Sequence, residues 1–305
     1  MKRRNFVKNT VLGASGLGLA TGFQASAKNT TPVEAKPFNL MYAPHNGMFR
    51  NHAGDDFVDQ IKFMADQGFR AIEDNGMMKR SVSEQERISK ALVDLDMQMG
   101  VFVIDKGGNA ANTLAAGKKE NEDVFLDGCR RAVEVAKRVN ATWMTVVPGN
   151  FERHLPLDIQ TANVIESLKK ACDIFEPHGL VMVLEPLSDT PDLYLRYSPQ
   201  AYLICKAVNS PACKILFDAY HQQKNEGHLI QHVEWTWDEI GYFQVGDNPG
   251  RREPYTGEIN YQNFFKYLYE KGYKGVVGME HGLSEGGKAG EQKLIDAYRK
   301  ADDFL

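Results

Sequence analysis

The sequence predicts an α/β protein organised as a single (β/α)8 TIM barrel that follows a cleavable signal peptide. Short apolar runs alternate with amphipathic helical segments along most of the chain, at spacings of roughly thirty residues that suit one βα unit each. Short buried runs of this kind are typical of parallel strands, and eight such units favour closure into a barrel. A doubly wound open sheet is the alternative, but no Gly-rich dinucleotide-binding loop follows the first run.

Each predicted element follows from a local pattern. Strands are expected to end near Ala43, Ile72, Ile104, Val147, Leu184, Phe217, Val245 and Met279. Apolar residues at helical spacing predict helices over residues 56–66, 83–95, 122–139, 161–175, 198–208, 261–271 and 291–304. The second of these helices opens with a capping pattern, Ser83 followed by Glu86. Left-handed residues are needed just past helix ends, and that is where Gly68, Gly179 and Gly272 stand.

The first residues read as an export signal rather than as part of the fold. A basic start is followed by an apolar, Gly-rich and Ala-rich stretch over 11–23 and by the small-residue cleavage pattern Ala25-Ser26-Ala27. Arg3-Arg4 indicates the twin-arginine type. We therefore expect a signal peptide over residues 1–27, a linker over 28–37 and the barrel over 38–305. The expected partner is the twin-arginine export machinery, the expected location is the periplasm, and no stable membrane insertion is expected.

Charge argues against a polyanionic partner. Cleavage after Ala27 takes four positive and no negative charges from a formal net charge of −4, leaving −8. Nucleic-acid binding needs clustered Lys and Arg to contact phosphates, so a nucleic-acid partner is not expected. Among the cysteines, Cys205 and Cys213 flank a predicted turn, and the sequence leaves open whether they pair.

Four of the predicted strands end in a side chain with a metal-binding oxygen. These side chains are Glu185, Asp218, Gln244 and Glu280. Because the carboxyl ends of barrel strands meet at one rim, where such barrels place their chemistry, we expect these groups to converge. Three carboxylates and an amide make an oxygen-rich site for a hard divalent cation.

Other candidate residues surround this rim in the sequence. His221 lies three residues after Asp218, so both side chains face one pocket if a helical turn begins there. A long polar loop over 248–261 carries Arg251 and Arg252, either of which could clamp a substrate carboxylate. His45, after the first strand, is a candidate for the pocket wall.

Three stretches together resemble a known family. The run over 73–80, Asp218-x-x-His221 and the stretch over 248–261 are similar to the hydroxypyruvate isomerase branch of the xylose isomerase-like TIM barrels, and the resemblance spans roughly residues 38–304. It implies one divalent metal ion (Mg, Mn, Co or Zn) on Glu185, Asp218, Gln244 and Glu280. It also implies that Glu185 and Glu280 form the acid/base pair and that His221 contacts substrate, together with an arginine for which the Pro-Gly-Arg order favours Arg251.

The expected function is an isomerase or epimerase that moves a proton next to a carbonyl of a small sugar or keto acid through an enediolate. One alternative is an exported lyase or hydratase acting on oxidised (3-keto) sugars, because an enediolate can also eliminate a substituent. Another is a non-catalytic sugar-acid binding protein. A phosphodiesterase ranks last, since the strand ends offer mainly carboxylates rather than the histidines of a multi-zinc cluster. The sequence leaves open the exact substrate and whether the protein is a homo-oligomer.

Overall fold

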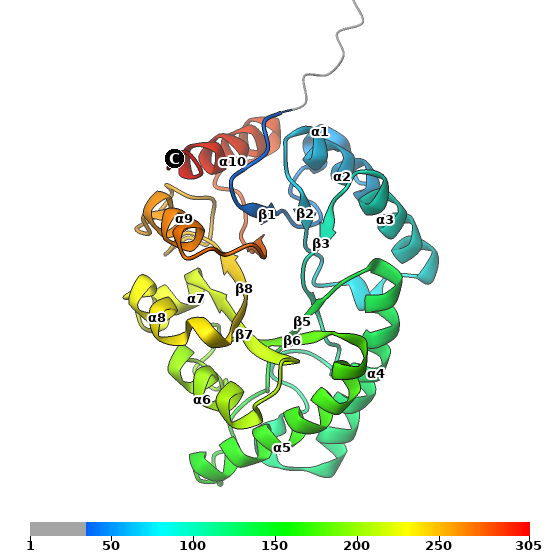
Figure 1. The fold of residues 1–305 in the computed structure, drawn as a ribbon, viewed down its shortest axis with the longest axis vertical. Coiled ribbons are helices and arrows are strands. Elements are labelled where there is room, and N and C mark those ends of the chain that lie inside the picture. The colour runs from blue at the N-terminus through cyan, green and yellow to red at the C-terminus, as the bar shows by residue number, and fades with distance from the viewer. Residues whose placement is uncertain (1–34) are drawn as a thin grey trace, which may run out of the picture. The chain divides into compact units, whose positions relative to one another are not determined.

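The computed structural model describes residues 35–305, in which short strands lie at the centre and helices surround them (Figure 1). The predicted signal peptide and most of the predicted linker lie outside the described residues. The strands, in chain order, are β1 (Met41–Ala43), β2 (Ala71–Ile72), β3 (Gln98–Met99), β4 (Phe102–Val103), β5 (Trp143–Val146), β6 (Val181–Leu184), β7 (Cys213–Asp218), β8 (Ile240–Val245) and β9 (Val276–Met279). Every predicted strand end lies within one residue of an observed one.

The strands run parallel in the manner of a TIM barrel. Seven of them form a sheet in the order β1-β9-β8-β7-β6-β5-β4, and β2 pairs with β3. Two isolated parallel bridges, His45 with Glu73 and Met99 with Ala141, link this pair to β1 and to the start of β5. The third predicted strand is observed as β3 and β4, which are separated by two residues. The fold is therefore a TIM-barrel-like α/β fold.

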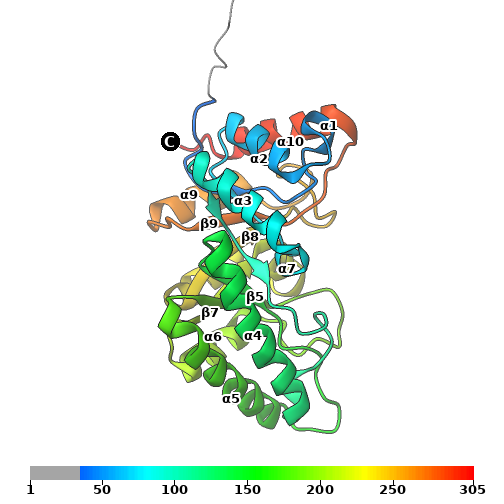
Figure 2. The same cartoon turned by 90° about the vertical axis from the view of Figure 1, so that its right-hand side faces the viewer.

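Helices pack on the outside of the strands, and α4, α5 and α6 lie side by side there (Figure 2). The α-helices are α1 (Arg50–Ala53), α2 (Phe57–Asp66), α3 (Val82–Asp94), α4 (Lys119–Val139), α5 (Leu157–Phe175), α6 (Ser198–Val208), α7 (Ala219–Asn225), α8 (Leu229–Thr236), α9 (Tyr261–Glu270) and α10 (Gly287–Ala301). Short 3-10 turns are η1 (Met77–Lys79), η2 (Leu114–Ala116), η3 (Glu176–His178) and η4 (Trp237–Glu239). No helix in residues 35–305 has the length and apolar character that a membrane span requires.

Several predicted helix boundaries are wrong. α4 begins at Lys119 rather than at 122, and α5 begins at Leu157 rather than at 161. The N-cap of α3 is Ser81, whose Oγ accepts from the Glu84 N–H at 3.2 Å, because the Ser-x-x-Glu pattern occurs twice and Ser83 is already helical. The last helix runs over Gly287–Ala301 rather than 291–304. Asp302 caps its end and accepts hydrogen bonds from the Asn39 N–H and the Tyr42 hydroxyl, so a contact with β1 stops the helix.

The interior of the barrel is layered. One apolar cluster fills it from several strands, namely Ala43, Ala71, Val101, Val183, Leu216, Tyr242 and Val276. Side chains alternate along a strand, so the residue two positions further on each strand faces the same interior. Those next positions are His45, Glu73, Val103, Glu185, Asp218, Gln244 and Gly278, with Glu280 a further two residues along, just past β9, and all but Val103 and Gly278 are polar. A polar layer therefore lies directly above the apolar one, at the carboxyl ends of the strands.

The four cysteines are buried free thiols. Cys205 lies on α6 and Cys213 on β7, and they are not joined by a disulfide.

Candidate metal centre

Three of the predicted ligands converge at the carboxyl ends of the strands. Glu185, Asp218, His221 and Glu280 each offer one ligand atom, and these four atoms lie within 4.8 Å of one another. Glu185 directly follows β6, where Pro186 provides no N–H to continue the strand ladder. Asp218 ends β7 and also caps α7, since its Oδ1 accepts from the Tyr220 N–H at 2.8 Å. The helical turn that begins there brings His221 back over the same rim, as its spacing from Asp218 allows.

Gln244 lies beside this cluster. It pairs in register with Asp218 on β7 and with Gly278 on β9. Its Nε2 lies 3.3 Å and 3.2 Å from the two carboxylate oxygens of Glu73. Its Oε1 is buried and has no hydrogen-bond partner among the described residues, and the same is true of Oε1 of Glu185. Buried polar atoms are nearly always paired, so these two oxygens indicate a site that receives a cation or a donor.

The hydrogen bonds of His221 fix its protonation. The Ser188 N–H donates to Nδ1 at 3.1 Å, and the Ser188 hydroxyl also contacts Nδ1 at 2.8 Å. Because Nδ1 accepts, the neutral ring carries its proton on Nε2, which lies 3.6 Å from Oδ2 of Asp218. Burial lowers the pKa of His221, although the charge of Asp218 opposes this, so the neutral ring is the form present at pH 7. A histidine that binds a metal normally donates its other N–H outward, whereas this one accepts there, so Nε2–H offers a donor instead.

Of the two loop arginines, Arg251 reaches the cluster. Its Nη2 donates to Oδ2 of Asp218 at 3.2 Å and to Oε2 of Glu280 at 2.8 Å, and its Nε donates to the Glu280 carbonyl at 3.1 Å. The same Nη2 lies 3.0 Å from Nε2 of His221. The two hydrogens of Nη2 are donated to the carboxylates of Asp218 and Glu280. The contact between Nη2 and Nε2 of His221 therefore places two donor nitrogens beside each other. Arg252 packs instead against Gly282.

The buried carboxylates of the cluster have raised pKa values. Burial raises the pKa of Glu185 well above its usual value, and the neighbouring carboxylates of Glu280 and Asp218 raise it further. Burial also raises the pKa of Glu280, to about 7, against the opposing charge of Arg251. Both shifts have the cause expected of carboxylates that share a buried site without enough positive charge, and such perturbed groups are typical of functional sites.

His45 stands beside the cluster and pairs with a carboxylate that the sequence reasoning did not single out. Its Nε2 lies 2.5 Å from Oε2 of Glu73, which is wholly buried. Burial lowers the pKa of His45, but the charge of Glu73 outweighs this and raises the pKa above its usual value. Asn75 was also missed, and its Nδ2 donates to Oε1 of Glu280 at 2.9 Å. The signal for Glu73 was present, since it follows β2 as Glu185 follows β6.

The loop that carries Arg251 is held by a buried carboxylate. Oδ2 of Asp247 accepts from the N–H groups of Thr256 and Gly257 at 3.1 Å and 2.9 Å, and Oδ1 accepts from that of Ile259 at 3.1 Å. A Cβ at Gly257 would overlap the carbonyl of Asn248, so only glycine fits there. The polar loop is thus a fixed structure that presents Arg251 to the cluster.

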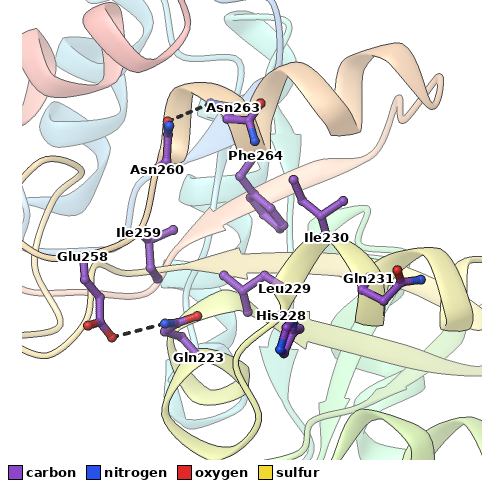
Figure 3. Close-up of a pocket in the computed structure, with 10 residues that line it drawn as sticks. All are labelled: Gln223, His228, Leu229, Ile230, Gln231, Glu258, Ile259, Asn260, Asn263 and Phe264. Atoms are coloured by element: carbon purple, nitrogen blue, oxygen red, sulfur yellow. Dashed lines mark hydrogen bonds between the residues drawn. The ribbon is translucent and has the colours of Figure 1, made fainter.

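A separate cavity of about 410 Å³ lies between α7, α8 and α9 (Figure 3). Apolar side chains of Leu229, Ile259 and Phe264 face it, and a hydrogen bond of 3.2 Å joins Gln223 to Glu258 at its edge. None of the predicted site residues lines this cavity. A smaller one of about 190 Å³ adjoins the cluster through Asn75.

Comparison with known proteins defines the class. The family model described as xylose isomerase-like TIM barrel matches residues 61–301, and the chain belongs to this family. It is 28% identical over 247 residues to the hydroxypyruvate isomerase of Escherichia coli (strain K12), covering 80% of this chain and 94% of that protein. It is 29% identical over 248 residues to a 2-oxo-tetronate isomerase of Cupriavidus necator, covering 80% of this chain and 92% of that protein.

The fold is similarly matched by a solved structure. The 3-keto-D-glucoside 4-epimerase of E. coli superimposes with a TM-score of 0.71 at 19% identity, covering 86% of this chain and 98% of that chain. Within the family, the sequence relatives place this chain in the hydroxypyruvate isomerase-like branch, among the isomerases and epimerases.

Proposed function

We propose that the protein is a divalent-cation-dependent isomerase or epimerase that moves a proton next to a carbonyl of a small sugar or keto acid through an enediolate. The observation that carries this proposal is the convergence of Glu185 and Glu280, two carboxylates with raised pKa, beside Asp218 and the unpartnered oxygen of Gln244. The sequence relatives support it, because they are named as isomerases of hydroxypyruvate and of 2-oxo-tetronate.

The donor set fits a hard divalent cation. Three carboxylates and one amide oxygen are the ligands that Mg²⁺ and Mn²⁺ accept, and two of the oxygens have no other partner among the described residues. We therefore propose Glu185, Asp218, Gln244 and Glu280 as the ligands. A cation held by these groups would supply positive charge that stabilises the oxygens of an enediolate.

The side chains around that position divide the remaining work. Glu185 takes the carbon-bound proton, and Glu280 returns a proton to the neighbouring carbon or to the opposite face, which gives isomerisation or epimerisation respectively. His221 donates from Nε2 to a substrate oxygen, and Arg251 contacts the substrate and balances the carboxylate charge. His45 forms part of the pocket wall. General acid–base help of this kind is worth on the order of 10²–10⁴ in rate.

We propose a periplasmic location for the protein from the sequence of residues 1–27, which lie outside the described residues. Their twin-arginine pattern supports export of the protein to the periplasm by the twin-arginine machinery.

Solvent deuterium exchange tests the proposed chemistry whatever the product of the reaction is. The protein is stripped of metal, supplied with Mn²⁺ and incubated in D₂O with keto acids, ketoses and 3-keto glycosides, and exchange is followed by proton NMR. We expect exchange at the carbon next to a carbonyl of at least one compound, lost on chelation and restored by the cation. Bound Mn²⁺ without exchange into any bound compound would contradict the proposal and favour a binding protein, and release of a leaving group would favour a lyase.

A further inference from the structure

We propose that Glu73 is a positioning residue, which turns the carboxamide of Gln244 so that its oxygen rather than its nitrogen faces the cation position. The inference rests on the proposed function, because it concerns how a proposed metal ligand is oriented. It assigns a role to a buried carboxylate that lies outside the cluster of Glu185, Asp218 and Glu280.

The contact between the two side chains determines which way the carboxamide faces. Nε2 of Gln244 lies within 3.3 Å of both carboxylate oxygens of Glu73. An ionised carboxylate has only acceptors, so the side of the carboxamide that faces it must be the NH2 group. Oε1 is then directed to the other side, and it is the buried atom without a hydrogen-bond partner among the described residues. The register places Asp218 of β7 on one side of Gln244 and Gly278 of β9 on the other.

The barrel makes room for Glu73 on the side of Gln244 away from Asp218. A Cβ at Gly278 would overlap the carboxylate of Glu73, and one at Gly100 would lie 3.0 Å from its Cγ. Gly278 on β9 and Gly100 between β3 and β4 therefore admit this side chain into the interior, where it lies beside Gln244. With Glu73 beside Gly278 of β9, the oxygen of the carboxamide is directed away from Glu73, and Asp218 pairs with Gln244 from the other neighbouring strand, β7.

His45 is the second side chain that contacts this buried carboxylate. The Nε2 of His45 lies 2.5 Å from Oε2 of Glu73. A parallel backbone bridge between His45 and Glu73, just past β1 and β2, brings the two side chains together. The contacts thus run from His45 through Glu73 to Gln244. Because a metal ligand held in the right orientation by such outer contacts typically gains 10–100-fold in affinity, the contact is expected to be measurable.

The first test measures Mn²⁺ affinity of the full chain by titration calorimetry, with Glu73→Gln as the variant. A glutamine at 73 replaces one of the two carboxylate oxygens that Nε2 of Gln244 contacts with an NH2 group, which can only donate. The carboxamide of Gln244 is then free to reverse, and we expect the Kd for Mn²⁺ to rise about 10–100-fold. Glu291→Gln is the matched control, because Glu291 is equally buried and also pairs with a histidine, His52, at 2.5 Å, away from the cluster. This control should leave the Kd unchanged.

The second test exchanges the two side chains. In Glu73→Gln/Gln244→Glu the carboxylate at 244 has two equivalent oxygens, so one can accept from the amide at 73 while the other faces the cation position. Net charge is conserved, and we expect Mn²⁺ affinity to recover to within a few-fold of the parent protein. Because a carboxylate at 244 is itself a good ligand, the coupling is measured against Gln244→Glu alone, and a purely structural Glu73 would show none. Circular dichroism and thermal unfolding report whether each variant is folded.

The outcomes separate this inference from the proposed function. A parent protein that binds no Mn²⁺ overturns both. A parent that binds Mn²⁺ and catalyses exchange, together with a folded Glu73→Gln whose Kd is unchanged, overturns only the role of Glu73. If Glu73→Gln does not fold, the exchanged variant decides, because a folded double variant with Mn²⁺ affinity as weak as that of Gln244→Ala would contradict the inference.

Discussion

The main-chain N–H of Ser188 lies 3.1 Å from Nδ1 of His221 and makes that nitrogen an acceptor. A backbone N–H can only donate, so the proton of the neutral imidazole is on Nε2, on the side of Asp218 and Glu185. At this rim the His221 side chain could either bind a cation through Nε2 or donate a hydrogen bond from Nε2–H, and the contact with Ser188 distinguishes the two roles. It favours His221 as a donor to substrate and leaves Gln244 as the fourth proposed ligand.

Replacing His221 should affect catalysis more than metal binding. His221→Leu removes the Nε2–H donor but none of the proposed oxygen ligands, so we expect kcat/KM to fall by roughly tenfold to 100-fold, the worth of a hydrogen bond to a charged oxygen. The Kd for Mn²⁺ should stay within about twofold of the parent value. Ser188→Ala keeps the main-chain N–H and serves as the control, with a small expected effect. A large loss of Mn²⁺ affinity in His221→Leu would identify His221 as a ligand.

The two central glutamates should be required for exchange but not for folding. Glu185→Gln and Glu280→Gln keep the shape of the side chain and cannot take up a proton, so exchange at saturating Mn²⁺ should slow by at least about 10². Because burial and like charges raise the pKa of Glu185, its neutral replacement should unfold at the same or a higher temperature in the absence of metal. Deuterium exchange and thermal unfolding check the two halves of this prediction. Near-normal exchange in both variants would remove the mechanism.

Asp247 should control the loop that presents Arg251. Asp247→Ala leaves three loop N–H groups without their acceptor, which costs about 1–3 kcal/mol for each one that stays buried. We expect a raised KM and faster proteolysis within residues 248–258. Asp127→Ala removes an exposed ion pair with Arg131 and should change neither, since surface pairs contribute little. An ordered, protease-resistant loop in Asp247→Ala would contradict this role.

Stability in acid should depend on Glu291, which joins α10 to α1. Burial opposes ionisation, but hydrogen bonds from Asn51 and His52 prevail and lower the pKa of Glu291 below its usual 4.5. A carboxylate with a lowered folded-state pKa stabilises the protein above the usual value, and this contribution is lost as pH falls through the folded-state pKa. Glu291→Gln should therefore lower the free energy of unfolding by about 1–3 kcal/mol at pH 7 and by progressively less below pH ~4.5.

Urea unfolding from pH 3 to pH 7 checks the prediction for Glu291. The exposed Glu270→Gln is the control, because its ion pair with Lys266 is 3.8 Å long and solvated. A constant difference between parent and Glu291→Gln across this range would mean that the carboxylate is not the source of the pH dependence.

Local pattern was enough to predict the strands and the identity of the groups at their ends. A buried run such as Val181–Leu184 followed by Glu185 and Pro186 has one physical interpretation, a strand that ends at a polar residue. Helix boundaries were less determined, because a helix end depends on contacts outside itself. Ser81 rather than Ser83 caps α3, and contacts of Asp302 with Asn39 and Tyr42 close α10.

By itself, the sequence determined the parallel α/β architecture and the presence of Glu185, Asp218, Gln244 and Glu280 at strand ends, since both follow from the periodicity of apolar residues. Only the tertiary structure decided which atoms of these side chains face the rim, that Arg251 reaches it while Arg252 does not, and that Glu73 lies against Gln244. Those relations join residues far apart in the chain, and hydrogen-bond direction is a property of the partners that folding brings together rather than of either residue alone.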